Sequence, residues 1–212
     1  MARYGREHTE ATRARILDSA GRRFKKDGLD GSGIATLMSD AGLSNGAFYA
    51  HFASKADLVE SVVSQELAGQ LANFNGLSPG RDGVAEFIEL YLSPEHRDHP
   101  ASGCPSAALL DEITRCPEGT RRSYAAGMAA IVDEMATRLA PADPSSVRGT
   151  AASVFAMMVG TLQLARAITD GPLADELLDG AARHARGLLG LDPAARSSTH
   201  DQTENTQGSR PR

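Results

Sequence analysis

Residues 34–58, IATLMSDAGLSNGAFYAHFASKADL, decide the fold of this chain. Ile34, Leu37 and Met38 recur at the spacing of one helix face, and the pattern stops just before Gly42. Glycine can take the positive φ that a sharp turn between two helices requires. The stretch therefore predicts a short helix that ends at the residue before this glycine and is followed by a tight turn.

A second short helix is predicted after the turn. Ser44 stands where an N-cap belongs, and its hydroxyl can accept a hydrogen bond from the open N–H groups of a helix that starts at Asn45. This helix is expected to run to about Phe52, and Phe48 and Phe52 are four residues apart, so both can face the core. Residues 54–57, Ser-Lys-Ala-Asp, have the form of a capping box that opens a third helix. Two helices joined by a glycine turn form the arrangement of a helix-turn-helix.

The outward face of the second helix carries groups suited to DNA. Asparagine can pair with adenine through two hydrogen bonds, alanine can contact a thymine methyl, and glycine lets the backbone approach the groove. Hydroxyl, imidazole and ammonium groups can donate to phosphates, which position a protein without reading sequence. Helix pairs with a glycine turn also occur in all-helical proteins that bind no DNA, so the spacing alone leaves both interpretations open. We expect base contacts from Asn45, Gly46 and Ala47, and phosphate contacts from Ser44, Tyr49, His51 and Lys55.

The same residues resemble a known family. A long first helix, a helix ending in Ala-Gly-Leu-Ser, and then Phe-Tyr-x-His-Phe-x-Ser-Lys-x-x-Leu are similar to the N-terminal domain of TetR-type (TetR/AcrR) transcriptional regulators, over about residues 9–60. Gly33 departs from the pattern, because the family often has a Thr or Ser cap there, and Asn45 and Ala47 stand where relatives often differ. The resemblance implies a homodimer that binds a palindromic operator in double-stranded DNA and responds to a small-molecule effector. The departures leave the operator sequence open.

The remainder of the chain is predicted to be helical. A first helix is expected over about residues 9–27, and a long helix over 55–75 would join the helix-turn-helix to the rest. The proline-containing segments 93–94 and 99–100 are predicted to be breaks. No alternating strand pattern of useful length is present, so the fold class is all-α. Further helices are expected at about 81–92, 105–115, 118–139, 145–169 and 173–189.

These elements predict two domains and a tail. Residues 1–56 would form a three-helix DNA-binding domain with the helix-turn-helix, and residues 57–190 a larger helical domain for ligand binding and dimerisation. Residues 191–212 are polar after their first leucine and cannot bury enough apolar surface to offset their ordering entropy. We therefore predict a disordered tail there.

Charge is divided unevenly along the chain. The formal net charge is −5, but residues 1–55 carry nine Lys or Arg against six Asp or Glu, while residues 56–212 carry thirteen against twenty-one. The positive excess lies with the motif, as expected for the part that approaches DNA, and Arg3 and Arg6 are expected to form a flexible arm near phosphates. No run of eighteen apolar residues and no apolar signal-peptide core is present. We therefore expect a cytoplasmic protein with no membrane partner.

The last two predicted helices, 145–169 and 173–189, each carry a broad apolar stripe. In TetR-type proteins the last two helices pair with their symmetry mates, whereas the same stripes could equally face the core of one subunit. The resemblance also implies a ligand pocket within residues 80–170, whose occupancy changes the separation of the two DNA-binding domains. Ordinary core packing is the alternative for each large or adaptable residue that suits such a wall. The candidates are Phe87, Tyr91, Cys104, Met128, Met135, Phe155, Met157 and Met158.

The two cysteines allow a sharper hypothesis. Cys104 precedes Pro105, and proline is favoured at the first position of a helix, so Cys104 is expected at an N-cap. A thiol at a helix N-terminus is favoured as thiolate, which makes Cys104 a candidate sensor of electrophiles or oxidants. Cys116 would lie about 18 Å away along one helix, beyond disulfide reach. A structural role for Cys104 is the alternative.

No enzyme signature is present in the chain. There is no glycine-rich phosphate loop, no Gly-x-Ser-x-Gly and no His-Glu-x-x-His, and the six histidines are scattered. We therefore expect no catalytic site, no metal and no cofactor. The interpretation is a ligand-responsive DNA-binding regulator that acts as a repressor. A helical adaptor that binds protein, and a thiol-based electrophile- or redox-sensing repressor that uses Cys104, are the alternatives.

Overall fold

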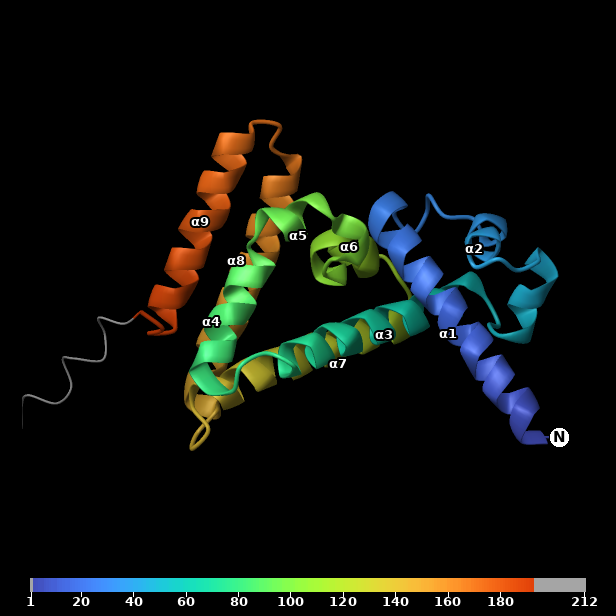
Figure 1. Cartoon of the computed structure of the whole chain (residues 1–212), viewed down its shortest axis with the longest axis horizontal. Helices are drawn as coiled ribbons and strands as arrows, with labels where there is room; N and C mark the ends of the chain where they lie inside the picture. Colours follow the sequence, from blue (N-terminus) through green and yellow to red (C-terminus); the bar gives the residue numbers. More distant parts are fainter. Residues whose placement is uncertain (1, 193–212) are drawn as a thin grey trace, which may run out of the picture.

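The computed structural model describes residues 2–192, and the side chains from residue 7 onward. Within this part of the chain the structure consists of helices and turns, without a strand, as predicted. Figure 1 shows α1, α2 and the segment after α2 gathered at one end, and the long helices α3, α4, α7, α8 and α9 forming the rest. The helices are α1 (Ala2–Asp27), α2 (Ile34–Asp40), η1 (Asn45–Ala50), α3 (Lys55–Asn75), α4 (Gly80–Tyr91), α5 (Pro94–Asp98), η2 (Pro100–Ser102), α6 (Pro105–Thr114), α7 (Glu118–Leu139), α8 (Ser145–Ala167) and α9 (Gly171–Leu188).

Helix α1 is longer than its sequence pattern indicated. It begins at Ala2 rather than near Thr9, so the backbone of Arg3 and Arg6 is helical and not a flexible arm. The C-terminal end lies where predicted, because Gly28 takes φ +81° and its N–H donates to Phe24 O at 2.8 Å. No proline stands between Ala2 and Thr9 to stop the helix, so it extends back to Ala2 in spite of Gly5.

The second short helix of the motif is a 3-10 helix that ends at Ala50, two residues before the predicted end near Phe52. Ser44 occupies the N-cap position, but its side chain makes no capping hydrogen bond, contrary to prediction. The segment is held by bonds to the residue three positions back, such as Ala47 N to Ser44 O at 3.0 Å and His51 N to Phe48 O at 2.9 Å. Because no side chain caps the segment, its first backbone N–H groups are satisfied by the tighter 3-10 hydrogen bonds instead.

The third predicted helix start is confirmed. Ser54 Oγ accepts from Asp57 N at 3.1 Å, and Asp57 Oδ2 accepts from Ala53 N at 2.9 Å. The two side chains therefore satisfy backbone N–H groups on both sides of the helix start. From this cap α3 runs without interruption to Asn75. Helix α3 therefore belongs to both domains and connects the three-helix domain to the larger one without a break.

The larger domain is built on pairs of long helices. Helix α3 packs along α7, α8 packs along both α7 and α9, and α4 contacts α7 and α9 (Figure 1). The predicted apolar stripe of α8 is buried within one subunit, with Val154, Met158 and Leu162 all fully covered. That stripe therefore forms core. Leu191 is also buried, although the sequence placed it in the tail, and the rest of the predicted tail, residues 193–212, lies outside the described residues.

Two short helices, α5 and η2, stand where breaks were predicted. Ser93 Oγ accepts from His96 N at 3.1 Å and Pro94 occupies the first helical turn, so the Ser-Pro pair begins a helix instead of ending one. Pro100 likewise starts η2, which contacts α1. A serine before a proline, followed by an acidic residue, is the sequence signal that could have indicated α5.

None of the helices in the described part of the chain combines the length and apolar character needed to cross a membrane.

Candidate functional site

The turn of the helix-turn-helix is closed by backbone bonds. Gly42 takes φ +67°, its N–H donates to Ser39 O at 2.9 Å, and Leu43 N donates to Met38 O at 2.9 Å. A side chain at this φ would be strained, so glycine is required by the backbone as the sequence predicted. The turn sets the direction in which η1 leaves α2.

Segment η1 has one buried face and one exposed face. Phe48 and Phe52 are buried with their ring centroids 5.7 Å apart, as their four-residue spacing predicted. Tyr49 is 69% exposed, and its ring meets the edge of Phe48 at 5.1 Å. Of the other residues predicted to contact DNA, Ser44, Asn45 and Gly46 are exposed and Ala47 is half-buried.

Two of the predicted phosphate contacts turn toward the protein. Lys55 Nζ donates to Leu29 O at 2.6 Å, which places its ammonium on the loop between α1 and α2. His51 is half-buried, and its Nδ1 is covered without a hydrogen-bond partner. The structure thus brings Ser44, Asn45 and Tyr49 to one exposed surface and sets Lys55 and His51 behind it.

The loop between α1 and α2 is also held from the larger domain. Glu112, on α6, accepts from Leu29 N at 2.7 Å and from Asp30 N at 3.3 Å through the same carboxylate oxygen. Together with the Lys55 bond, this clasp ties the three-helix domain to α3 and α6. Helix α6 is therefore bonded directly to the loop that precedes the helix-turn-helix.

Replacing Glu112 by alanine is expected to lower the free energy of unfolding by about 1–3 kcal/mol, because it leaves the buried Leu29 N–H without an acceptor. Urea unfolding followed by circular dichroism measures the change. The neighbouring Asp111 is a matched control, since it pairs with Arg115 only on the surface and its loss should change stability by less than about 0.5 kcal/mol. Equal effects of the two alanine variants would contradict the clasp.

A cavity of about 490 Å³ lies in the larger domain, lined by residues of α3, α4, α5, η2 and α6 and, from the three-helix domain, by Asp18 of α1. Three of the predicted ligand residues, Phe87, Tyr91 and Cys104, line it. The other predicted ones do not, because they pack elsewhere: Met135, Phe155 and Met158 are buried in the core, and Met128 and Met157 are half-buried against it. Large apolar residues are needed equally by a core and by a pocket wall, which is why the prediction mixed the two.

The polar part of the cavity wall was missed by the sequence reasoning. It comes chiefly from α3, which contributes Gln65, Glu66, Gln70 and Asn73. The apolar stripe of this helix predicted only its core face. On another face, Glu66, Gln70 and Asn73 recur at intervals of four and three residues. That spacing marks a second, polar face of the same helix and could have indicated the wall.

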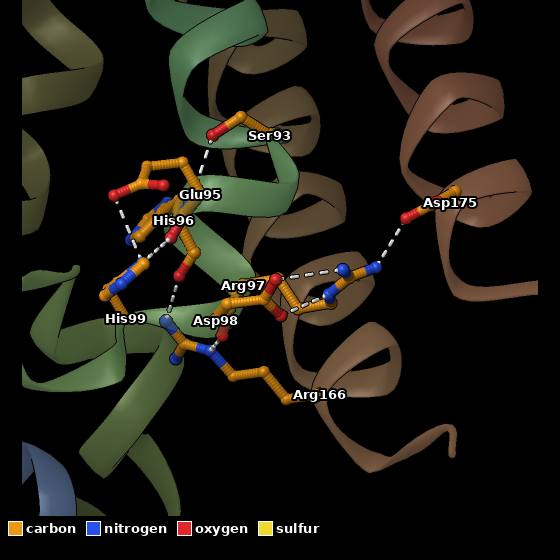
Figure 2. A network of polar contacts seen from close by, with 8 residues as sticks. All are labelled: Ser93, Glu95, His96, Arg97, Asp98, His99, Arg166 and Asp175. Atoms are coloured by element: carbon orange, nitrogen blue, oxygen red, sulfur yellow. Dashed lines mark hydrogen bonds and ion pairs between the residues drawn. The ribbon is translucent and has the colours of Figure 1, made fainter. Parts of the chain in front are cut away.

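A polar network surrounds His96, which lines the cavity beside Cys104, and Figure 2 shows its part around Arg97 and Arg166. His96 Nε2 accepts from Cys104 N at 2.9 Å, so Nδ1 carries the proton that is donated to Tyr91 O at 2.8 Å. Arg166, on α8, donates to His96 O at 2.8 Å and to Arg97 O at 3.2 Å. Figure 2 also shows Arg97 reaching from α5 toward α9, where its Nη1 lies 2.6 Å from an oxygen of Asp175.

Acid is expected to destabilise the protein through His96. Burial, followed by the nearby Arg166 and Lys25 charges, lowers the pKa of His96 below its usual value near 6.5, so the folded state binds fewer protons than the unfolded state in mildly acidic solution. Stability should therefore fall as the pH drops below about 6.5. Thermal unfolding at pH 7.5 and 5.5 measures this loss, and His96→Gln should show a smaller difference between the two pH values. An unchanged difference in that variant would contradict the assignment.

The residues described by the structure contain no group of three or more His, Cys, Asp or Glu side chains that could hold a metal ion.

The helix-turn-helix region matches a protein-family model. Residues 16–62, which run from the middle of α1 into α3, match the model described as bacterial regulatory proteins of the tetR family. The turn, the exposed face of η1 and the capped start of α3 all fall within this stretch.

Curated proteins extend the similarity to the larger domain. The transcriptional regulator UidR of Escherichia coli strain K12 is 30% identical over 190 residues, which cover 86% of this chain and 91% of UidR. The regulator AcrR of Shigella flexneri is 32% identical over 106 residues. This match covers 46% of this chain and only about half (49%) of AcrR. The whole fold resembles the crystal structure of E. coli NemR in its reduced form, with a TM-score of 0.71, 19% identity and coverage of 84% and 96% of the two chains.

Proposed function

The chain belongs to the TetR family of bacterial transcriptional regulators and is a DNA-binding regulator, and from this premise we propose that it is a homodimeric repressor released from a palindromic operator by a small molecule. The observation that carries the proposal is the two-faced segment η1. Phe48, with Phe52 just after the end of η1, anchors the segment in the core, while Asn45, Gly46 and Tyr49 stand exposed.

The proposed DNA contacts divide into two groups. Asn45, Gly46 and Ala47 read base edges in the major groove, because an amide and a small side chain on an exposed segment can reach adenine and thymine there. The exposed Ser44 and Tyr49 donate to phosphates, joined by His51 and Lys55 after modest side-chain movement. Lys55 gives one of its three donors to Leu29 O and retains two for this purpose.

Dimerisation is supported by exposed leucines on the last two helices. Leu164 on α8 and Leu173 and Leu188 on α9 are each at least half exposed in one subunit. Two subunits related by a twofold axis place two recognition segments about 34 Å apart, one turn of DNA, which a palindrome requires. Sedimentation at micromolar concentration is expected to give a species of twice 22.3 kDa, and a species of that single mass alone would overturn the dimer.

The effector is proposed to bind in this cavity of the larger domain. Its volume of about 490 Å³ lies within the range of small-molecule sites, and α6 joins it to the DNA-binding domain. Cys104 and Pro105 at the start of α6 line the cavity, while Glu112 further along α6 holds the loop before α2. A ligand that binds the DNA-incompetent state more tightly than the DNA-competent state shifts the protein toward the incompetent one. The largest possible loss of operator affinity is set by the ratio of the ligand's affinities for these two states.

The test is a gel shift on the DNA flanking the protein's own gene, with increasing salt. We expect specific retention that weakens as salt rises, because phosphate contacts release counterions. Asn45→Ala should lower operator affinity about 5- to 150-fold, whereas Asn75→Ala, at the far end of α3, should leave it unchanged. Absence of retention on any promoter fragment would favour a helical adaptor that binds protein.

A thiol-based mechanism is a second candidate, supported by the placement of Cys104. Cys104 is 4% exposed, occupies the N-cap position of α6 without a side-chain capping bond, and lines the cavity. NemR, of similar fold, has been crystallised in a reduced form. The Cys104 thiol would add across the carbon–carbon double bond of an electrophile such as N-ethylmaleimide. The sulfur forms a bond to one carbon, and the thiol proton passes to the adjacent carbon. Loss of operator binding on this treatment should disappear in Cys104→Ser and persist in Cys116→Ser. Equal loss in Cys104→Ser would exclude the mechanism.

A further inference from the structure

We propose that the cavity of the larger domain binds a carboxylate with an apolar body, and that the half-buried guanidinium of Arg166 is the counter-charge for this carboxylate. The inference rests on the proposed function only in taking this cavity as the effector site. It is carried by the hydrogen-bond partners of Arg166, by its position beside a glycine of the cavity wall, and by a row of rings that leads from this glycine to an apolar wall.

Arg166 is a cation without a carboxylate partner among the described residues. Its Nη2 donates to His96 O at 2.8 Å and its Nε to Arg97 O at 3.2 Å, both on α5 (Figure 2). These bonds use two of the five N–H donors of a guanidinium, and Nη1 donates to no acceptor in the described part of the chain. The neighbouring Arg97, by contrast, is paired with both Asp98 and Asp175. The bonds to α5 therefore hold Arg166 in place and leave its charge uncompensated.

The guanidinium of Arg166 lies beside Gly103, which lines the cavity. A Cβ added at Gly103 would lie 3.0 Å from Arg166 Nη2 and 2.6 Å from His96 Nε2, so a larger residue at this position would collide with both groups. The next residue, Cys104, begins the ten-residue helix α6 without a side-chain capping bond, and the open N–H groups there add positive potential. An anion seated against Gly103 and Cys104 is therefore close to a guanidinium and to a helix N-terminus.

The charges that act on this end of the cavity are positive. Burial, followed by the charges of Arg166 and Lys25, lowers the pKa of His96, which lines the cavity beside Gly103. Two carboxylates line the cavity as well, but Glu66 is already paired with Lys25 at 2.5 Å, and the other accepts a hydrogen bond from α3. The cation that remains for a ligand at this end, among the described residues, is Arg166.

A row of aromatic rings leads from this end of the cavity to an apolar wall. The Tyr91 ring lies 4.8 Å from that of His96 and 5.8 Å from that of Phe87, measured between centroids. Phe87 in turn stacks on Phe74 at a centroid distance of 4.4 Å, and all four residues line the cavity. Apolar groups of a ligand are stabilised by burial against such rings. A charged end and an apolar side fit an amphipathic acid, such as an aromatic carboxylate.

The experiment is calorimetric titration of the full-length protein with 2-naphthoate and with 2-naphthamide, which has a similar shape and no charge. We expect 2-naphthoate to bind at least about fivefold more tightly, because charge-assisted hydrogen bonds are roughly twice as strong as neutral ones. Raising the salt concentration should weaken 2-naphthoate and leave 2-naphthamide unchanged, since added ions screen a charge pair that is partly exposed.

Substitutions at Arg166 separate its charge from the packing of the cavity. Arg166→Gln should weaken 2-naphthoate at least about fivefold and leave 2-naphthamide within about twofold, because only the carboxylate loses its counter-charge. Arg166→Lys keeps the charge and should retain more of the 2-naphthoate affinity than Arg166→Gln does. Arg97→Gln is the matched control, since Arg97 belongs to the same network but is already paired with two carboxylates. It should leave the affinities for both probes unchanged.

The outcomes separate the inference from the proposed function. No binding of 2-naphthoate, equal affinities of the parent protein for the two probes, or equal weakening of both probes in Arg166→Gln would overturn the inference, even if operator binding is intact. A loss of 2-naphthoate affinity in Arg97→Gln as large as that in Arg166→Gln would also overturn it. Selective binding of 2-naphthoate that depends on salt and on the charge of Arg166 supports it. Where such binding leaves operator affinity unchanged, the ligand class stands and the effector role of the cavity fails.

Discussion

Replacing Phe48 by alanine is expected to lower the free energy of unfolding of the DNA-binding domain by about 3–5 kcal/mol. Phe48 is fully buried, and it is the residue through which η1 packs on the core of the three-helix domain. Removing the ring leaves a cavity under a segment that has no side-chain cap, so η1 loses its main attachment. Since whole domains are stable by only about 5–15 kcal/mol, the variant should bind operator weakly at 37 °C.

Tyr49 provides the matched control for this prediction. It is the adjacent aromatic residue but is 69% exposed, so Tyr49→Ala should change stability by less than about 0.5 kcal/mol. Its effect should appear as lower operator affinity with an unchanged unfolding midpoint. Urea unfolding and fluorescence anisotropy on the same preparations measure the two quantities. A Phe48→Ala variant with the midpoint of the parent protein would refute the assigned packing.

The second large effect is expected at the buried ion pair between α1 and α3. Lys25 Nζ lies 2.5 Å from Glu66 Oε2, and the two side chains are only 4% and 19% exposed. Glu66→Ala leaves a buried ammonium without a counter-charge, which should lower the free energy of unfolding by about 3–5 kcal/mol. Thermal and urea unfolding of the single variant measure the loss.

A double substitution distinguishes the pair from simple packing. Lys25→Met combined with Glu66→Leu removes both charges and keeps apolar volume, so it should recover most of the stability lost in Glu66→Ala. The surface pair of Arg122 and Glu118 is the control, since both side chains are about 70% exposed and Glu118→Ala should cost no more than about 1 kcal/mol. A double variant as unstable as Glu66→Ala would show that the carboxylate acts through contacts other than Lys25.

The helices were predictable where their boundaries depend on neighbouring residues. The starts of α3, α6 and α7 were predicted at or next to their observed positions, because capping serines and prolines act within one turn. The same rule was misapplied at Ser93-Pro94 and His99-Pro100, where the prolines were interpreted as breaks although they begin α5 and η2. The 3-10 form of η1 was not predicted, because it depends on a cap that Ser44 does not make.

The proposed DNA-contact surface and the cavity were predictable to different degrees. The exposed face of η1 followed from the four-residue spacing of Phe48 and Phe52, which is local information. The cavity was predicted only through Phe87, Tyr91 and Cys104, since its polar wall comes from a helix face whose neighbours lie elsewhere in the chain.

The sequence by itself determined the all-helical class, the glycine turn after α2 and the family, because these depend on residues within a few positions of one another. Only the tertiary structure decided that Glu112 holds Leu29, which lies 83 residues earlier, and that Lys55 turns to the same loop. It also decided which apolar residues line a cavity and which fill the core. The physical reason is that burial and hydrogen-bond partners are properties of elements packed against each other, whereas periodicity reports only which residues share a face.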